Sequence, residues 1–83
     1  MKYKKNQNIS CEKIDDVMIV LNHDTGKYLE LNRSAVFIWS IIENKNRDQI
    51  VQLFSNNFKV SNDEAAMLTD EFLDNCIQHR LIV

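Results

Sequence analysis

The spacing of apolar residues changes once along the chain, at Asn32. Before that point the chain has strand character, and within residues 27–31 apolar and polar residues alternate, which is typical of strands. Residues 8–14 predict a weak strand, and residues 15–22 predict a strong one rich in β-branched side chains. The four residues "HDTG" then lead into residues 27–31, so the second and third strands are expected to form a hairpin.

Beyond that point the apolar spacing is that of helices. Residues 33–42, RSAVFIWSII, are apolar nearly all round and predict a buried central helix with Asn32 as its N-cap. Residues 46–58 predict a second helix, because their apolar positions lie on one stripe. Asn46 and Gln49, at its start, have the spacing of a capping box.

The last predicted helix spans about residues 62–80, and Ser61 with Glu64 forms a second capping-box pattern before it. The centre of its apolar face is formed by Ala65, Leu68, Phe72 and Cys76. Its two flanks carry Leu73 and Ile77 on one side and Met67, Glu71 and Asn75 on the other. Helical phase alone does not decide which flank faces the sheet. The predicted fold is α+β and winged-helix-like: a three-stranded antiparallel sheet followed by three helices.

The composition indicates the domain organisation and the cellular location. The chain has 83 residues, 45% hydrophobic and 27% charged, with one Gly and no Pro. One small domain over residues 9–83 is expected, preceded by a flexible basic tail at residues 1–8. No apolar run approaches the roughly 18 residues that a membrane span needs, and the basic start leads into no apolar signal segment. A cytoplasmic location is therefore expected, with no membrane partner.

Charge decides against nucleic acid as the preferred partner. The net charge is −2, whereas duplex DNA binding needs Lys and Arg to neutralise phosphates. The last helix, the natural recognition helix of such a fold, ends with Arg80 as its only basic residue. Its acidic residues are Asp63, Glu64, Asp70, Glu71 and Asp74. A winged-helix DNA-binding regulator remains the alternative function.

Few residues have the spacing of a catalytic, phosphate-binding or metal-binding site. His23 lies in a predicted turn and His79 near a helix end, so no nucleophile and base are paired, and Gly26 alone makes no phosphate loop. Cys11 and Cys76 are expected to be free buried thiols; a disulfide, or a zinc site with the two histidines, is the alternative. The sequence predicts a binding module rather than an enzyme, with no cofactor and no metal.

Four motifs in order give a family resemblance. "VMIVLNHDTGKYLELNRSAVFIW" resembles the strand, turn and apolar helix of PqqD-like proteins, which are also called RiPP recognition elements. "FLDNCIQHRLIV" is similar to the end of the family's last helix, and Asn46 to Ile50 is similar to the entry of its second. Two positions depart from the family pattern: Arg80 stands where Gly is usual, and Leu68 where an acidic residue is frequent.

The resemblance implies a function in peptide recognition. In this family the third strand is an open sheet edge, and the leader of a ribosomally made precursor peptide adds to it beside the third helix. The backbone of residues 27–31 would pair with the leader. The implicated residues are Lys27, Tyr28, Leu29, Glu30, Leu31, Leu68, Glu71, Phe72 and Asn75.

The resemblance also implies partners. These are the leader peptide and separate tailoring enzymes, such as a leader protease and a cyclase or radical enzyme, as in lasso-peptide or pyrroloquinoline quinone pathways. The Asn-, Lys- and Ile-rich composition favours a peptide product of the lasso type. An open edge strand also predicts self-association as a homodimer.

Overall fold

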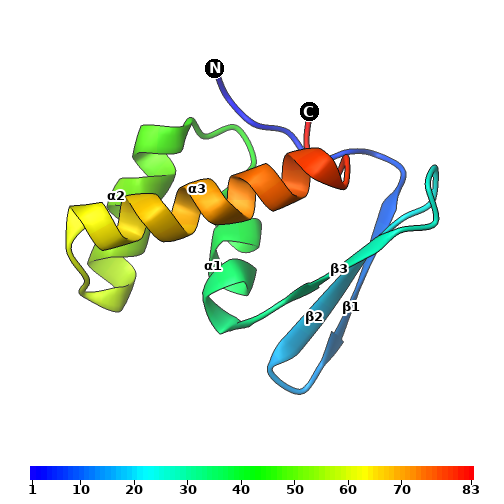
Figure 1. Ribbon diagram of the computed structural model, residues 1–83, viewed down its shortest axis with the longest axis horizontal. Coiled ribbons are helices and arrows are strands. Elements are labelled where there is room, and N and C mark those ends of the chain that lie inside the picture. The colour runs from blue at the N-terminus through cyan, green and yellow to red at the C-terminus, as the bar shows by residue number, and fades with distance from the viewer.

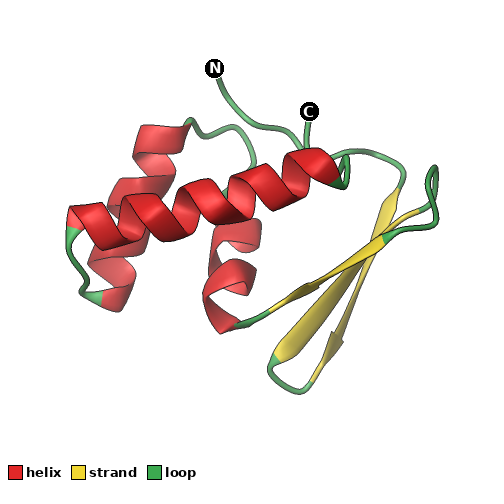
Figure 2. Cartoon of the chain, in the orientation of Figure 1, coloured by secondary structure: helices red, strands yellow, loops and turns green.

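The computed structural model describes all 83 residues and has three strands followed by three helices (Figure 1; Figure 2). The elements in order are β1 (Ile9–Ile14), β2 (Val17–Asn22), β3 (Tyr28–Leu31), α1 (Arg33–Ile41), α2 (Arg47–Phe58) and α3 (Asn62–Gln78). The predicted α+β fold, with an antiparallel three-stranded sheet before three helices, is confirmed. None of the helices is both long enough and apolar enough to cross a membrane.

The sheet has the order β1-β2-β3, so β3 lies at one edge and β1 at the other. Gly26 closes the β2–β3 connection with a φ of +74°, a left-handed conformation that favours glycine. In the β2–β3 register Met18 lies opposite Leu31 and Val20 opposite Leu29. These side chains share the face that meets the helices, because residues opposite one another in a ladder point the same way.

The core lies between that face and the three helices. Val20 and Leu31 from the sheet are buried together with Ile38 and Trp39 of α1 and with residues of α3. The run of apolar residues in α1 is thus explained by its central place, as predicted. On its far side, Phe37 packs edge-on against the aromatic rings of α2.

α1 and α2 begin with the predicted caps, and α3 begins with one of the two bonds of its predicted capping box. The Asn32 side chain accepts the Ala35 N–H at 3.0 Å. The capping box at the start of α2 is complete, with bonds of 2.9 Å in both directions. At α3 the Ser61 hydroxyl accepts the Glu64 N–H at 3.2 Å, but the Glu64 side chain makes no return bond to the cap.

The last helix ends two residues before the predicted boundary. Arg80 has a φ of +54°, which is left-handed. The Arg80 N–H donates to the Ile77 carbonyl at 3.1 Å, and the Leu81 N–H donates to the Cys76 carbonyl at 2.8 Å. This pair of bonds is a Schellman motif, with Arg80 in the position that glycine most often takes.

Residues 3–6, which belong to the predicted basic tail, make backbone hydrogen bonds to residues near the C-terminus and to Lys45. Lys4 and Val83 exchange backbone bonds of 3.3 and 2.8 Å, and the Lys5 ammonium lies 4.5 Å from the centre of a Trp39 ring. The Tyr3 N–H also donates to the Lys45 carbonyl at 2.9 Å. These partners are distant in sequence, so local composition could not indicate them.

The two cysteines are free thiols in different environments. Cys76 lies in the core, and its burial raises the pKa of the thiol to about 12. Cys11 is exposed, contrary to the prediction, because it lies on the edge strand β1, of which all residues but Ile9 are exposed. No group of three or more His, Cys, Asp or Glu side chains is arranged to hold a metal ion.

Candidate binding cleft

β3 has a free edge, but only alternate residues present their backbone to it. Asn22 donates its N–H to the Lys27 carbonyl at 2.9 Å, so these two residues are a hydrogen-bonded pair of the ladder. Every second residue after Lys27 must therefore bond to β2 as well. The N–H and C=O groups of Tyr28 and Glu30 point away from β2, and no other segment of the chain bonds to them.

The sequence predicts that the whole backbone of residues 27–31 can pair with a partner strand. This alternation limits the available N–H and C=O groups to every second residue. Leu29 and Leu31 use their backbone groups in the ladder with β2. Their side chains face α3, whereas the open backbone belongs to Tyr28 and Glu30. The free edge thus consists of two N–H and two C=O groups.

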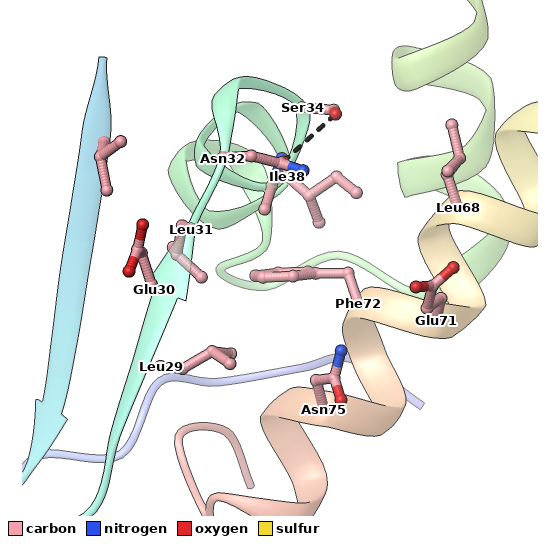
Figure 3. Close-up of a pocket in the computed structure, with 12 residues that line it drawn as sticks. Leu29, Glu30, Leu31, Asn32, Ser34, Ile38, Leu68, Glu71, Phe72 and Asn75 are labelled. Carbon is pink, nitrogen blue, oxygen red and sulfur yellow. Dashed lines mark hydrogen bonds between the residues drawn. The ribbon is translucent and has the colours of Figure 1, made fainter.

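A cleft of about 270 Å³ lies beside this edge, between β3, the first turns of α1 and the middle of α3. All the residues predicted for the site line it except Lys27 and Tyr28. Leu29 and Leu31 point from β3 toward α3, and the Phe72 ring points back toward Leu31 (Figure 3). The free edge of β3 and the middle of α3 therefore border the same cleft, which is the arrangement that the resemblance implied.

The apolar residues of the cleft form a floor and two walls. Leu31 and Phe72 are only 1% and 6% exposed, so they form the floor and also belong to the core. Leu29 on β3 and Leu68 on α3 are half-buried, so they form walls that a bound molecule can still contact. The position at which the family often has an acid is thus an apolar wall in this chain.

The rim of the cleft is polar and acidic. Glu71 is exposed, and Asn75 is half-buried beside Phe72. The Glu30 side chain, between Leu29 and Leu31 in sequence, points to the other face of the sheet, away from α3 (Figure 3). No Lys or Arg is among the lining residues. A carboxylate without a basic neighbour in the cleft favours a bound molecule that carries positive charge near Glu71.

Two predicted residues lie outside the cleft. Lys27 is exposed beside the turn and bonds through its carbonyl to β2. The Tyr28 side chain is 62% exposed and, opposite Leu21, belongs to the outer face of the sheet. Lys27 therefore offers nothing to the cleft or the free edge, and Tyr28 offers its backbone alone.

Several lining residues were missed by sequence reasoning, and most come from the start of α1. They are Val17, Asn32, Ser34, Ala35 and Ile38. The Ser34 hydroxyl donates to the Asn32 side chain at 3.3 Å (Figure 3). The sequence does carry a signal for these residues, because a helix that directly follows an edge strand must begin beside that edge.

The flank of α3 that faces the cleft is the one with Glu71 and Asn75. On the opposite flank Leu73 is buried in the core and Ile77 is exposed to solvent. Asp70 lies away from the cleft and accepts two bonds from Arg47 of α2, at 2.7 and 2.9 Å. That guanidinium, mainly through its hydrogen bonds, lowers the pKa of the Asp70 carboxyl below its usual value.

Residues 18–82 match the family model described as coenzyme PQQ synthesis protein D, PqqD. The chain belongs to the PqqD family. No curated protein sequence matches this PqqD family member significantly.

Two solved structures are similar to this PqqD family member along nearly all of both chains. One is TbiB1 in complex with the TbiA(beta) leader peptide, 25% identical, with a TM-score of 0.82 and coverage of 99% of this chain and 94% of that one. The other is a lasso peptide synthetase B1 complexed with the leader peptide, with a TM-score of 0.84 and coverage of 100% and 99%. At 17% identity the second shows the shared fold alone.

Proposed function

We propose that this PqqD family member is a noncatalytic recognition protein for the leader of a ribosomally synthesised precursor peptide. The leader adds as a fourth strand to the free edge of β3 and lies in the cleft against α3. The protein then delivers the precursor to separate tailoring enzymes of a lasso-type pathway, such as a leader protease and a cyclase.

The observation that carries this proposal is the coincidence of an open strand edge and an apolar cleft. The free N–H and C=O groups of Tyr28 and Glu30 border the same opening that Leu29, Leu68 and Phe72 line. Strand addition uses both parts, because backbone bonds hold the peptide and pockets read alternate side chains. The likeness to TbiB1 in its leader complex supports the same arrangement.

The edge alone is a weak binding site. Each hydrogen bond contributes a net of about 0.5–1.5 kcal/mol, so the four groups of Tyr28 and Glu30 give roughly 2–6 kcal/mol together. Ordering a disordered peptide costs about 2–5 kcal/mol or more. Most of the net affinity must therefore come from apolar leader side chains in the cleft, at about 25 cal/mol per Å² of buried apolar surface.

The cleft also indicates what the leader carries. An apolar side chain fits over Leu29, Leu68 and the edge of the Phe72 ring. A Lys or Arg two or more residues along would reach Glu71, the acid of the rim. A leader with one bulky apolar residue and a basic residue close to it suits this site.

The rival functions fit the molecule less well. DNA binding through α3 would bring Glu64, Glu71 and Asp74, all exposed, against phosphates. For an enzyme, the cleft has no nucleophile beside a base, since its polar groups are carboxylates, amides and the Ser34 hydroxyl, which is bonded to the Asn32 side chain.

The test is titration of the 83-residue protein with synthetic leader peptides from any short precursors encoded beside its gene. Calorimetry should give saturable one-to-one binding, and a scrambled peptide of the same composition should not bind. In amide NMR spectra the largest shifts should occur at Tyr28 and Glu30 and along the cleft face of α3. Precursor incubated with the protein alone should keep its mass. Binding without shifts in β3, or a change of precursor mass, would refute the proposal.

A further inference from the structure

Two asparagines with the same local geometry converge on the end of α3. The Asn22 amide donates to the carbonyls of His79 and Arg80 at 3.0 and 3.1 Å, while its oxygen accepts the Asp24 N–H at 2.8 Å. The Asn6 amide donates to the same Arg80 carbonyl at 2.8 Å, and its oxygen accepts the N–H two residues on at 3.0 Å. The two differ in what they attach α3 to: Asn22 ends β2, and Asn6 belongs to the N-terminal segment.

Asn22 is the one hydrogen-bonded connection between the sheet and the end of α3. No other residue of β1, β2 or β3 bonds to α3 or its cap, through backbone or side chain. The α3 backbone instead runs along α2, to which Asp70 is also attached through Arg47. Without Asn22, α3 would be held at its angle to the sheet by apolar side-chain packing and, indirectly, by the bonds between the N-terminal segment before β1 and residues 80–83.

The position of Asn22 connects both sides of the cleft. Its own backbone bonds to Lys27 and Gly26, at the start of β3, with distances of 2.9 and 2.8 Å. Its side chain holds His79, which follows Asn75 by one helical turn, and Asn75 lines the cleft. Asn22 is completely buried and lines no part of the cleft. It is nevertheless hydrogen-bonded to the segments that continue into both sides of the cleft, the start of β3 and the end of α3.

We propose that Asn22 is a positioning residue that fixes the angle between α3 and the sheet and so sets the width of the cleft. Its amide supplies donors to the carbonyls of His79 and Arg80, the two residues that follow α3 and that lie beyond the hydrogen-bond ladder of the helix. The leader then meets a cleft already at the width that it needs, which lowers the cost of binding. The consequence for leader binding rests on the proposed function; the consequence for the angle of α3 does not.

The test compares Asn22→Ser with Asn6→Ser. Serine can keep the local turn at each position, because its hydroxyl also accepts the N–H two residues on. It is too short to reach the carbonyls of His79 and Arg80. Both variants therefore remove a bond to the Arg80 carbonyl, but only Asn22→Ser releases α3 from the sheet.

The first readout is the distance between β1 and α3, measured by pulsed electron resonance with spin labels on Cys11 and on Ile77→Cys. Both positions are exposed and outside the cleft, and Cys76 is buried and will not label. Asn22→Ser should broaden the distance distribution relative to the parent, and Asn6→Ser should leave it unchanged. An unchanged distribution in Asn22→Ser, or equal broadening in both, would overturn the proposal.

The second readout is the affinity for the synthetic leader peptide, measured where all variants are folded. If the variant populates a cleft of the right width only about a tenth of the time, affinity falls about tenfold. Asn6→Ser should stay within about twofold of the wild type by the same reasoning. Equal losses in the two variants would make Asn22 an ordinary structural residue.

Two controls keep the outcomes separate. If the wild type binds no leader, the proposed function fails, and the distance measurement still decides the role of Asn22. If Asn22→Ser is too unstable to measure, both serine variants are made in the Arg80→Gly background, which relieves the left-handed backbone at that residue.

Discussion

Glu71 is the residue on which the electrostatic character of the cleft can be tested. It is exposed, lines the cleft and has no hydrogen-bond partner in the structure. Glu71→Lys should change the free energy of unfolding by no more than about 0.5 kcal/mol, as surface substitutions usually do. It should weaken binding of a basic leader several-fold, because it reverses the charge on the rim.

Calorimetry with the synthetic leader measures this effect, and Asp74→Lys is the matched control. Asp74 is exposed on the same helix but does not line the cleft. The two variants have the same net charge. Equal weakening in both would mean a long-range charge effect, and loss in Asp74→Lys alone would place the leader on the other flank of α3.

Arg80 stores backbone strain at the end of α3. A left-handed conformation costs a residue with a Cβ about 1 kcal/mol or more, and glycine avoids most of this cost. Because Arg80 has a φ of +54°, the substitution Arg80→Gly should raise the free energy of unfolding by about 1 kcal/mol. Urea denaturation measures the change. Arg80→Ala keeps the Cβ and should give no such gain; a gain of equal size would assign the effect to the lost arginine side chain.

The Arg47–Asp70 pair should make stability depend on pH in acid. Hydrogen bonds from Arg47 lower the pKa of the Asp70 carboxyl below its usual value in the folded state. A carboxyl with a lowered folded pKa stabilises the fold above its unfolded pKa, and this contribution is lost as the pH falls through the folded value. Asp70→Asn should therefore be less stable than the wild type near neutral pH and equal to it in strong acid.

Both side chains of this pair are partly exposed, 42% and 51%, so the effect should be small and should shrink at high salt. Denaturant unfolding at several pH values measures it. Asp74→Asn, which removes an exposed acid without a salt-bridge partner, should show no comparable pH-dependent loss. A constant difference at all pH values would show that Asp70 acts by packing.

At the scale of elements, the alternation in β3 separates two proline substitutions that look equivalent in sequence. Leu29→Pro removes a donor from the ladder with β2 and should destabilise the sheet. Glu30→Pro removes a donor that faces solvent, where edge strands tolerate proline. Glu30→Pro should therefore fold and yet lose most of its affinity for the leader.

Circular dichroism and calorimetry on the two variants check this prediction. Glu30→Ala is the control, because it removes the carboxylate and keeps the N–H. If Glu30→Pro binds as Glu30→Ala does, the leader does not pair with the β3 edge. If Leu29→Pro folds normally, the hydrogen-bonding register inferred for β3 is wrong.

The sequence was sufficient for the elements and for most of the cleft. The change of apolar period at Asn32 located sheet and helices, and caps such as Asn46 located helix starts, because these signals are local. The phase of the last helix placed Glu71 and Asn75 on one flank but could not orient that flank. Orientation depends on packing between distant elements.

The features that sequence reasoning missed also depend on distant contacts. The Asn22–Lys27 pairing at the turn determines which residues of β3 point their backbone N–H and C=O groups away from β2. Period-two alternation of side chains alone is compatible with either set of residues. The N-terminal segment is ordered by Leu81 and Val83, more than seventy residues away in sequence. The role inferred for Asn22 likewise requires His79 and Arg80 to be brought beside it.

On the scale of the whole molecule, the helices lie to one side of the sheet and leave both of its edges open (Figure 1). The cleft lies beside the edge of β3. The edge of β1 carries Lys13 and Glu12, both exposed, and charged side chains discourage pairing there. The free groups of β3 are thus the natural place for any strand addition, by a leader or by another copy of the chain.

A homodimer through β3 follows from the same geometry. When two β3 edges pair antiparallel with Leu29 opposite its own copy, Tyr28 of each lies opposite Glu30 of the other, so no like charges meet. The dimer would then use the same N–H and C=O groups of Tyr28 and Glu30 that the leader needs. Dimer and leader complex must therefore exclude each other, and leader should convert dimer to monomer by mass action.

Size-exclusion chromatography with light scattering, at rising protein concentration and with and without leader, measures this competition. The wild type should shift toward a dimer as concentration rises and return to a monomer on addition of leader. Glu30→Pro should remain a monomer throughout, because it lacks a donor on the shared edge. If leader binds a dimer of unchanged size, the dimer uses another surface, and β1 is then the edge that remains to form it.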